Sequence, residues 1–300
     1  MNENETGEER PILVAVANPD HAVQLVRTGG DLARVNDGVV QLVSVVVKSH
    51  ESPFSVYSDE TIIERYSANS REILEGAVAA APDDVDVDDM LVVSRSLVDG
   101  ILTAVERTNA RALVVGWRER ERRTDAVLGT TVDRLIERVP CDLYVERIGH
   151  EADGVDSVLV PVAGGPHVRP AVRVAKAIAA RNDATVRLQS VADGETDAKT
   201  AREYLAQAET SFEDAPGPSV RTESLLHDGD DIAQRLLETA SDHDVLVFGA
   251  TRHGALHRRL VGSIPQRVTR RTDRTVILAR DGNTVRGPIL QQIRQLIPSA

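Results

Sequence analysis

The sequence predicts an α/β protein built from two tandem copies of one doubly wound, parallel-sheet unit. Short apolar runs alternate with amphipathic segments of helical length, which is the pattern of a parallel sheet covered by helices on both faces. Residues 12–45 repeat as residues 158–191 at a constant offset of 146, without a gap. Each half also carries two glycines separated by 13 positions, namely Gly116 with Gly129 and Gly249 with Gly262.

The first half shows a regular alternation of strands and helices. Residues 12–16 form a short apolar run bounded by Pro11 and Pro19, which is typical of a buried strand. Asp20 is placed to cap the helix that follows. An exposed loop is expected at residues 48–59. Further strands are predicted at residues 39–47, 90–93, 113–115 and 143–145, and further helices at residues 61–81, 97–108 and 131–139.

The second half repeats this order in fewer residues. Its copy restarts at Val158, and the offset between equivalent residues falls from 146 to 133 by the last strand, so the second copy is 13 residues shorter. We assign the loss to the loop at 48–59. A repeat this long and this strict is stronger evidence than any short motif. The predicted parts are one domain at residues 11–148, a second at 157–281, and a tail at 284–300.

Composition excludes several classes of protein. The 300 residues suit about two domains, and the net charge of −12 argues against broad nucleic-acid binding. No apolar run approaches the ~20 residues of a membrane span. The single cysteine, Cys141, and the polar first ten residues favour a cytoplasmic protein. The acidic, lysine-poor composition resembles proteins of salt-loving archaea, and a GC-rich genome is an equally good explanation.

The second half contains a candidate anion site. An apolar run ends at Gly249, a basic loop follows, and Gly262 and Ser263 open a predicted helix. Glycine lets a phosphate approach the backbone, and a serine at a helix start leaves free N–H groups facing an anion. The alternative is an ordinary strand-to-helix connection that needs glycine only for its turn.

With these motifs the chain resembles a tandem universal stress protein, over residues 11–148 and 157–281. The resemblance implies five-stranded parallel sheets in the order 3-2-1-4-5 and an adenine nucleotide, ATP or AMP, bound through a motif G-x2-G-x9-G-[ST] after strand four. It also implies that the two fifth strands face each other, residues 143–145 against 276–278. The matching positions are Gly249, Gly262 and Ser263 in the second half, and Gly116, Gly129 and Thr130 in the first.

The sequence also departs from the family pattern. Arg252 and Glu119 occupy the middle glycine of the motif. Arg252 is either a phosphate ligand or an ordinary surface arginine. The aspartate that ends strand one in nucleotide-binding members is Ala163 here, with Gly164 next to it, and Ala17 in the first half. The positions that contact adenine through the backbone match Val191 and Val45. Because Glu119 repels phosphate, the resemblance favours nucleotide binding by the second half.

Three functions fit these features. The favoured one is a cytoplasmic regulatory protein of the universal stress class that senses an adenine nucleotide or another phosphorylated small molecule. The second is a ligand-free adaptor of a membrane transporter, because strings such as Gly-Ser-Ile-Pro resemble the soluble two-domain tail of archaeal amino-acid permeases. The third is a slow ATPase, for which the sequence indicates no catalytic residues. No metal site is expected, since His253 and His257 have no third ligand at suitable spacing.

The tail is expected to be an amphipathic helix. After Pro288, the residues Ile289, Leu290, Ile293, Leu296 and Ile297 fall on one helical face. A helix this short is marginal unless something covers its apolar stripe. Self-association of chains through the tail and packing of the tail onto its own domain remain the two alternatives.

Overall fold

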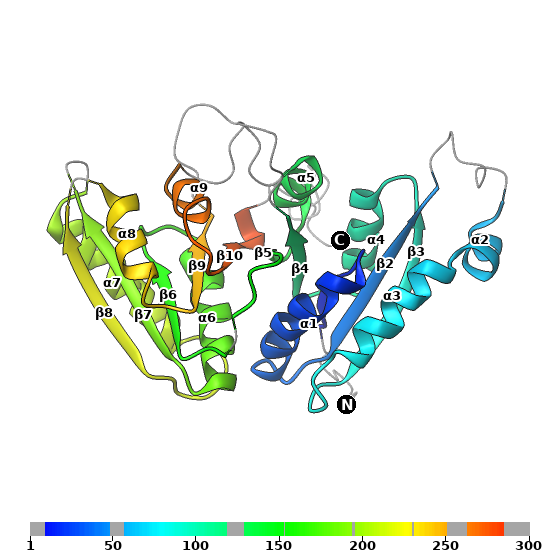
Figure 1. Cartoon of the computed structure of the whole chain (residues 1–300), viewed down its shortest axis with the longest axis horizontal. Helices are drawn as coiled ribbons and strands as arrows, with labels where there is room; N and C mark the ends of the chain where they lie inside the picture. Colours follow the sequence, from blue (N-terminus) through cyan, green and yellow to red (C-terminus); the bar gives the residue numbers. More distant parts are fainter. Residues whose placement is uncertain are drawn as a thin grey trace, which may run out of the picture.

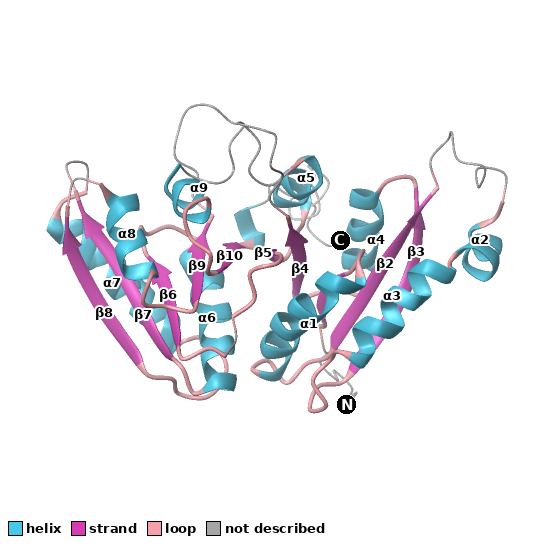
Figure 2. Ribbon diagram, viewed as in Figure 1, coloured by secondary structure: helices cyan, strands magenta, loops and turns pink. Residues whose placement is uncertain are grey.

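The computed structural model describes residues 10–48, 57–118, 129–152, 154–193, 196–229, 231–250 and 263–284. Ten strands form one twisted sheet, with helices packed on both of its faces (Figures 1 and 2). The strands of the first half are β1 (Ile12–Ala15), β2 (Val40–Val47), β3 (Val87–Ser94), β4 (Ala112–Trp117) and β5 (Asp142–Arg147). Those of the second half are β6 (Ser157–Pro161), β7 (Thr185–Ala192), β8 (Thr222–Asp228), β9 (Val245–Gly249) and β10 (Thr275–Arg280).

The helices alternate with the strands as the sequence predicts. In the first half they are α1 (Pro19–Arg34), α2 (Asp59–Tyr66), α3 (Ala68–Ala79), α4 (Leu97–Arg107) and α5 (Thr130–Arg138). In the second half they are α6 (Val168–Asn182), α7 (Ala198–Glu213), α8 (Ile232–Ala240) and α9 (Ser263–Thr269), followed by the 3-10 turn η2 (Gly282–Thr284). None of the described helices combines the length and the apolar character needed to cross a bilayer.

The two halves share one mixed sheet, which corrects the prediction of two separate sheets. The strand order is β3-β2-β1-β4-β5-β10-β9-β6-β7-β8, so each half counted alone has the order 3-2-1-4-5. The joint is the antiparallel pair β5–β10, with Val145 opposite Leu278 and Tyr144 opposite Ala279. The predicted meeting of the fifth strands is therefore confirmed. The pairing is physically favourable because each fifth strand would otherwise expose an unpaired edge.

Each face of the sheet carries one core that runs through both halves. Neighbouring strand residues point to opposite faces, so Val14 and Val160 join the core beneath α1, α3, α6 and α7. Leu13 and Leu159 join the core beneath α4, α5, α8 and α9. Strands buried on both faces need apolar residues at successive positions, which explains their valine-rich and leucine-rich runs.

Two arginines fasten the joint reciprocally. Arg147, at the end of β5, donates from Nη1 to the carbonyl oxygens of Thr269 and Thr272 at 2.9 and 2.6 Å. Arg280, at the end of β10, donates from Nη2 to the carbonyl oxygens of Val139 and Cys141 at 2.6 and 3.0 Å. Both side chains are buried. Each half thus satisfies backbone carbonyls at or just after the end of the last helix of the other half.

Three local predictions were wrong in detail. The helix expected at 61–81 is divided at Ser67 into α2 and α3. The first helix is capped by Asn18, whose Oδ1 accepts from the Asp20 N–H at 2.9 Å, so Asp20 lies inside the helix. β3 begins at Val87, before the predicted 90, because exposed aspartates are tolerated on a strand at the end of a sheet. Residues 49–56 of the expected loop and residues 285–300 of the tail lie outside the described residues.

Candidate functional site

A cavity of about 290 Å³ lies at the carboxyl ends of β6, β7 and β9. It is lined by Ala163, Gly164, Val191 and Gly249, four of the positions at which the sequence predicts a ligand. β6 is the strand at which the order of the second half reverses, since β7 and β9 lie on its two sides. Ligands of open α/β sheets bind at such a switch point because the connections there diverge to opposite faces.

The loop after β6 forms one wall of the cavity. Gly164 and Gly165 have φ values of +72° and +84°, which glycine adopts without strain. A Cβ atom on Gly164 would lie 2.5 Å from Cε1 of Tyr204, so the tyrosine ring of α7 packs directly on this backbone. The two left-handed glycines explain how the chain turns here.

Gly249 has a packing role in addition to its place in the cavity. A Cβ atom there would lie 3.0 Å from the carbonyl oxygen of His167, so only glycine lets β9 approach the start of α6 this closely. Nδ1 of His167 accepts a hydrogen bond from the Asp281 N–H at 3.0 Å, and its side chain is buried. The cavity wall is thereby connected to the segment that follows β10.

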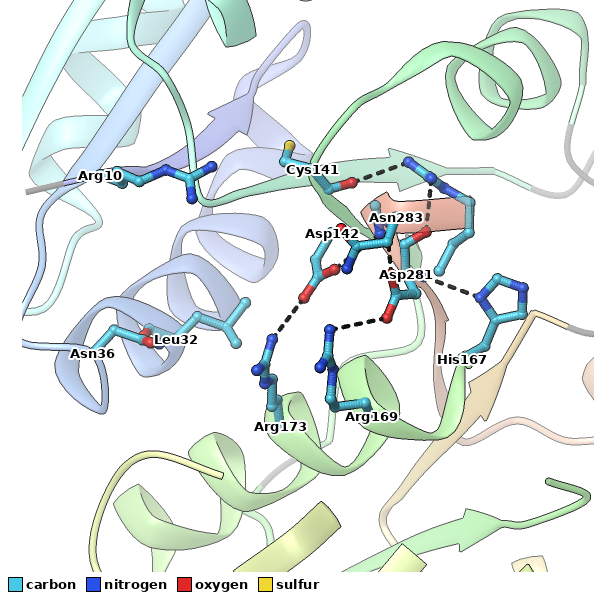
Figure 3. A network of polar contacts seen from close by, with 12 residues as sticks. Arg10, Leu32, Asn36, Cys141, Asp142, His167, Arg169, Arg173, Asp281 and Asn283 are labelled. Carbon is cyan, nitrogen blue, oxygen red and sulfur yellow. Dashed lines mark hydrogen bonds and ion pairs between the residues drawn. The ribbon is translucent and has the colours of Figure 1, made fainter. Parts of the chain in front are cut away.

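A polar network carries this connection to the joint between the halves (Figure 3). Asp281 and Asp142 face Arg169 and Arg173 of α6, at oxygen–nitrogen distances of 3.5 and 3.1 Å. The Oδ1 atom of Asp142 accepts from the Gly282 N–H at 3.0 Å. These contacts tie β5 of the first half, α6 and η2 into one cluster next to the cavity.

Sequence reasoning missed Gln189 in the same cavity. Its side chain is 1% exposed, and neither its Nε2 nor its Oε1 atom has a hydrogen-bond partner. The internal repeat could have revealed Gln189, because the equivalent residue of the first half is Val43, a buried core residue. A glutamine inside an apolar strand, where the other copy has valine, marks a position that the fold itself does not require to be polar.

Of the other residues predicted to bind a ligand in the second half, one lies next to the same cavity and the others lie outside the described residues. Ser263 begins α9, and the two residues that follow it, Ile264 and Pro265, line the cavity. The side chain of Ser263 is not described, and Arg252 and Gly262 lie outside the described residues, as do His253 and His257. Among the residues that are described, no group of three histidine, cysteine, aspartate or glutamate side chains could hold a metal ion.

The equivalent positions of the first half are packed with protein side chains. A Cβ atom on Gly116 would lie 2.9 Å from Cδ1 of Ile148 and 3.3 Å from Cδ1 of Leu25. Val45 packs directly against Gly100 of α4. Ala17 is exposed beyond the end of β1. Apolar contacts therefore occupy the region next to Gly116.

The end of the first-half motif is only partly described. Gly129, with φ +85°, precedes α5 as its N-cap residue, and Thr130 is the first residue of that helix. Glu119, which we expected to repel phosphate, lies outside the described residues.

A second cavity, of about 240 Å³ and lined by several charged residues, lies between α1 and α6 at the joint. Glu146 is fully buried there and accepts from Thr28 Oγ1 at 2.7 Å and from Gln24 Nε2 at 2.8 Å. Burial raises the pKa of the Glu146 carboxyl to about 7. Burial likewise raises the pKa of Asp31 to about 6, against the opposing charges of Arg181 and Arg34.

Comparison with known proteins gives one family for both halves. The model of the universal stress protein family matches residues 9–147 and 154–280. A universal stress protein from Archaeoglobus fulgidus is 16% identical with a TM-score of 0.61, and the match covers 90% of this chain and 98% of that chain. The search of curated protein sequences found no significant match.

Two further solved structures are similar to this chain. The cytoplasmic domain of a prokaryotic cation chloride cotransporter is 13% identical with a TM-score of 0.55, covering 92% of this chain and 97% of that chain. A universal stress protein from Archaeoglobus fulgidus, solved with dAMP, is 26% identical with a TM-score of 0.29, covering 36% of this chain and 82% of that chain. Because the family model accounts for both halves, the chain belongs to the universal stress protein family, with two tandem domains.

Proposed function

We propose that this protein is a cytoplasmic regulatory protein that binds an adenine nucleotide, ATP or AMP, in the cavity of its second half. The observation that carries the proposal is the convergence of Ala163, Gly164, Val191 and Gly249 on one cavity at the switch point of the sheet. Its walls are largely apolar with few polar groups, which is the usual lining of a small-molecule site.

The proposal assigns the ligand to the second half only. In the first half, Ile148 and Leu25 lie within contact distance of where a Cβ atom on Gly116 would be. In the second half, the position equivalent to Ile148 is Asp281, whose main-chain N–H is bonded to His167 on the cavity wall. The two copies therefore keep one scaffold but differ in the residue that follows the last strand, which is apolar in the first half and acidic in the second.

The contacts of the cavity wall support a regulatory role. His167 links the cavity to Asp281 and to the ion pairs at the joint. A bound ligand would contact a wall that belongs to the interface between the halves.

The test is binding of ATP and AMP to the full chain, measured by calorimetry, with native mass spectrometry of the purified protein to detect nucleotide that co-purifies. The variant is Ala163→Phe, which places a ring at the exposed mouth of the cavity. Its matched control is Ala17→Phe, the same change at the equivalent exposed position of the first half. We expect Ala163→Phe to weaken binding by about tenfold or more and Ala17→Phe to leave it unchanged, as steric exclusion from one site requires.

The alternative proposal is a ligand-free adaptor of a membrane transporter, such as an amino-acid permease. The observation that favours it is the apolar packing around Gly116, where Ile148 and Leu25 lie against the first glycine of the motif. The same measurements separate the two proposals. Absence of binding heat with either nucleotide, together with a native mass equal to that of the bare chain, would support the adaptor and contradict the nucleotide sensor.

A further inference from the structure

A third cavity, of about 220 Å³, lies at the joint between the halves. It is found where β1, β4 and β5 begin and where α1 ends, and α6 and the segment after α7 contribute to it from the second half. We call it the Tyr144 cavity. Its polar lining residues in the described part of the chain are Asn36, Arg111, Asp142, Tyr144 and Arg173.

The wall of the Tyr144 cavity carries a tyrosine hydroxyl without a partner. Tyr144 is 2% exposed and belongs to the core beneath α1 and α6. No described residue forms a hydrogen bond with its hydroxyl, yet this oxygen is not closed off as the amide atoms of Gln189 are, so it opens into the cavity. Burial raises the pKa of Tyr144 well above its ordinary value, so the hydroxyl stays protonated. Buried polar groups are almost always satisfied, and this one can be satisfied by a molecule in the cavity.

Two arginines bring positive charge to the same cavity. Arg111 is exposed, and its guanidinium forms no hydrogen bond or ion pair within the described residues. Arg173 donates from Nη1 to Oδ2 of Asp142 at 3.1 Å (Figure 3), and it has further N–H groups that no described contact uses. Both oxygens of Asp142 are occupied, since Oδ1 accepts from the Gly282 N–H at 3.0 Å. The described lining therefore carries one excess positive charge and unused donors.

The internal repeat shows that the fold requires neither the hydroxyl nor the charge of Arg111. The second cavity, next to Glu146, is the counterpart of the Tyr144 cavity, because lining positions correspond under the repeat, as in Leu32 with Ile178, Asn36 with Asn182, and Ala112 with Val245. The equivalent of Tyr144 is Ile277, which lines that second cavity. The equivalent of Arg111 is Asp244, whose carboxylate accepts from the first N–H of β6. Tyr144 and Arg111 thus add polar groups where the other copy of the same scaffold does without them.

The rest of the lining indicates the size and character of a ligand. The remaining described walls are apolar and consist of Ile12, Leu32, Ala112 and Pro216. Inorganic phosphate would leave this apolar surface uncovered and would bring up to two negative charges close to Asp142. A volume of about 220 Å³ lies below the ~300–1,000 Å³ of sites for drug-sized ligands, so the ligand is small. Guanidinium groups pair with a carboxylate through parallel N–H···O bonds.

We propose that the Tyr144 cavity binds a small organic carboxylate, whose carboxylate group pairs with Arg111 and Arg173 and whose second oxygen-bearing group bonds to the Tyr144 hydroxyl. Arg111 and Tyr144 come from the first half and Arg173 from the second, so the site is complete only in the joined sheet. It is distinct from the proposed nucleotide cavity, because no described residue lines both.

The test uses the full chain with NMR labels on the rings of its four tyrosines. The probes are pentanoate, 4-oxopentanoate, 5-oxohexanoate and inorganic phosphate, each added without nucleotide. The signal that disappears in Tyr144→Phe belongs to Tyr144, and we expect it to shift in a saturable way with the three carboxylates. Calorimetry then gives the affinities. Tyr144→Phe should weaken binding of the two oxo acids by roughly 2- to 10-fold, as loss of one neutral hydrogen bond does, and leave pentanoate unchanged.

The charge is tested by Arg111→Gln, which should weaken binding of all three carboxylates by roughly 10- to 100-fold, as loss of a charge-assisted hydrogen bond does. The matched control is Arg107→Gln, at an exposed arginine of α4 that is not among the residues of the cavity, and it should bind like the wild type. Thermal melting of each variant checks its fold. We expect no loss of stability in Tyr144→Phe, because the hydroxyl has no described partner.

The results that contradict the proposal are specific. Absence of a saturable shift of the Tyr144 signal with every carboxylate refutes the site. Equal affinities of Arg111→Gln and Arg107→Gln refute the role of Arg111, and an unchanged affinity of Tyr144→Phe for the oxo acids refutes the contact with the hydroxyl. Phosphate that binds as tightly as the carboxylates shows a general anion site and overturns the assignment of the ligand. Because no nucleotide is present, none of these results bears on the proposed nucleotide cavity.

Discussion

Replacing Glu146 by glutamine is expected to stabilise the protein at neutral and alkaline pH. The carboxyl is fully buried at the joint, where Thr28 and Gln24 donate to its two oxygens and no described cation pairs with it directly. The equivalent residue of β10 is Ala279, so the fold does not require a carboxylate at this position. A glutamine can keep both hydrogen bonds, because the Thr28 hydroxyl can accept as well as donate.

The magnitude follows from the pKa of the carboxyl. Burial raises it from 4.5 to about 7, and each pKa unit corresponds to 1.36 kcal/mol. Below about pH 4.5 the group is protonated in both the folded and the unfolded state and contributes nothing. As the pH rises toward 7 the unfolded chain ionises first, so the free energy of unfolding falls by about 3 kcal/mol, and above pH 7 the full cost remains. Glu146→Gln removes this dependence.

The assay is urea denaturation of the full chain at pH 5, 6, 7 and 8. We expect Glu146→Gln to raise the free energy of unfolding by up to about 3 kcal/mol at pH 8 and by much less at pH 5. Glu72→Gln, on the exposed surface of α3, serves as the control and should show no such trend. An effect of Glu146→Gln that is the same at pH 5 and pH 8, or a loss of stability at pH 8, would refute the reasoning.

Four further predictions test other parts of the structure. Arg280→Met should destabilise the fold by about 3 kcal/mol in urea, because buried carbonyls of the other half lose a charged donor. An unchanged midpoint and slope would contradict this. Gly164→Ala should lower the free energy of unfolding by about 2–3 kcal/mol, and Gly129→Ala should lower it by about 1 kcal/mol. Both glycines have positive φ, but only a Cβ atom at Gly164 would also meet a tyrosine ring. Equal losses for the two variants would contradict the contact with Tyr204. Burial raises the pKa of Cys141 to about 12, so its thiol should react with a disulfide reagent at pH 8 only after denaturation. Deleting residues 287–300 should lower the mass in light scattering if the tail joins chains; an unchanged mass with a lower melting temperature would show that it packs on its own domain.

The local pattern of the sequence predicted most of the secondary structure. Apolar runs such as 12–16 and amphipathic segments such as 97–108 depend on neighbours within a few residues, so they can be recognised without the fold. The internal repeat then assigned equivalent roles to distant residues. Together with the family resemblance it predicted that 143–145 would meet 276–278, and the pairing of β5 with β10 confirms it.

The repeat and the family motif allowed the sequence to predict which residues would lie together at one end of the sheet. Ala163, Gly164, Val191 and Gly249 come from three strand ends that a doubly wound sheet places together, and they share one cavity.

Only the tertiary structure decided the contacts between elements far apart in the sequence. It joined the two predicted sheets into one and gave Arg147 and Arg280 their carbonyl partners across the joint. It also buried Glu146, and this burial raises the pKa of its carboxyl. It left both side-chain amide atoms of Gln189 buried without a hydrogen-bond partner. Periodicity fixes which face of an element is buried, but burial, pKa and hydrogen-bond satisfaction depend on which other element lies against that face, and that is set by packing across the whole chain.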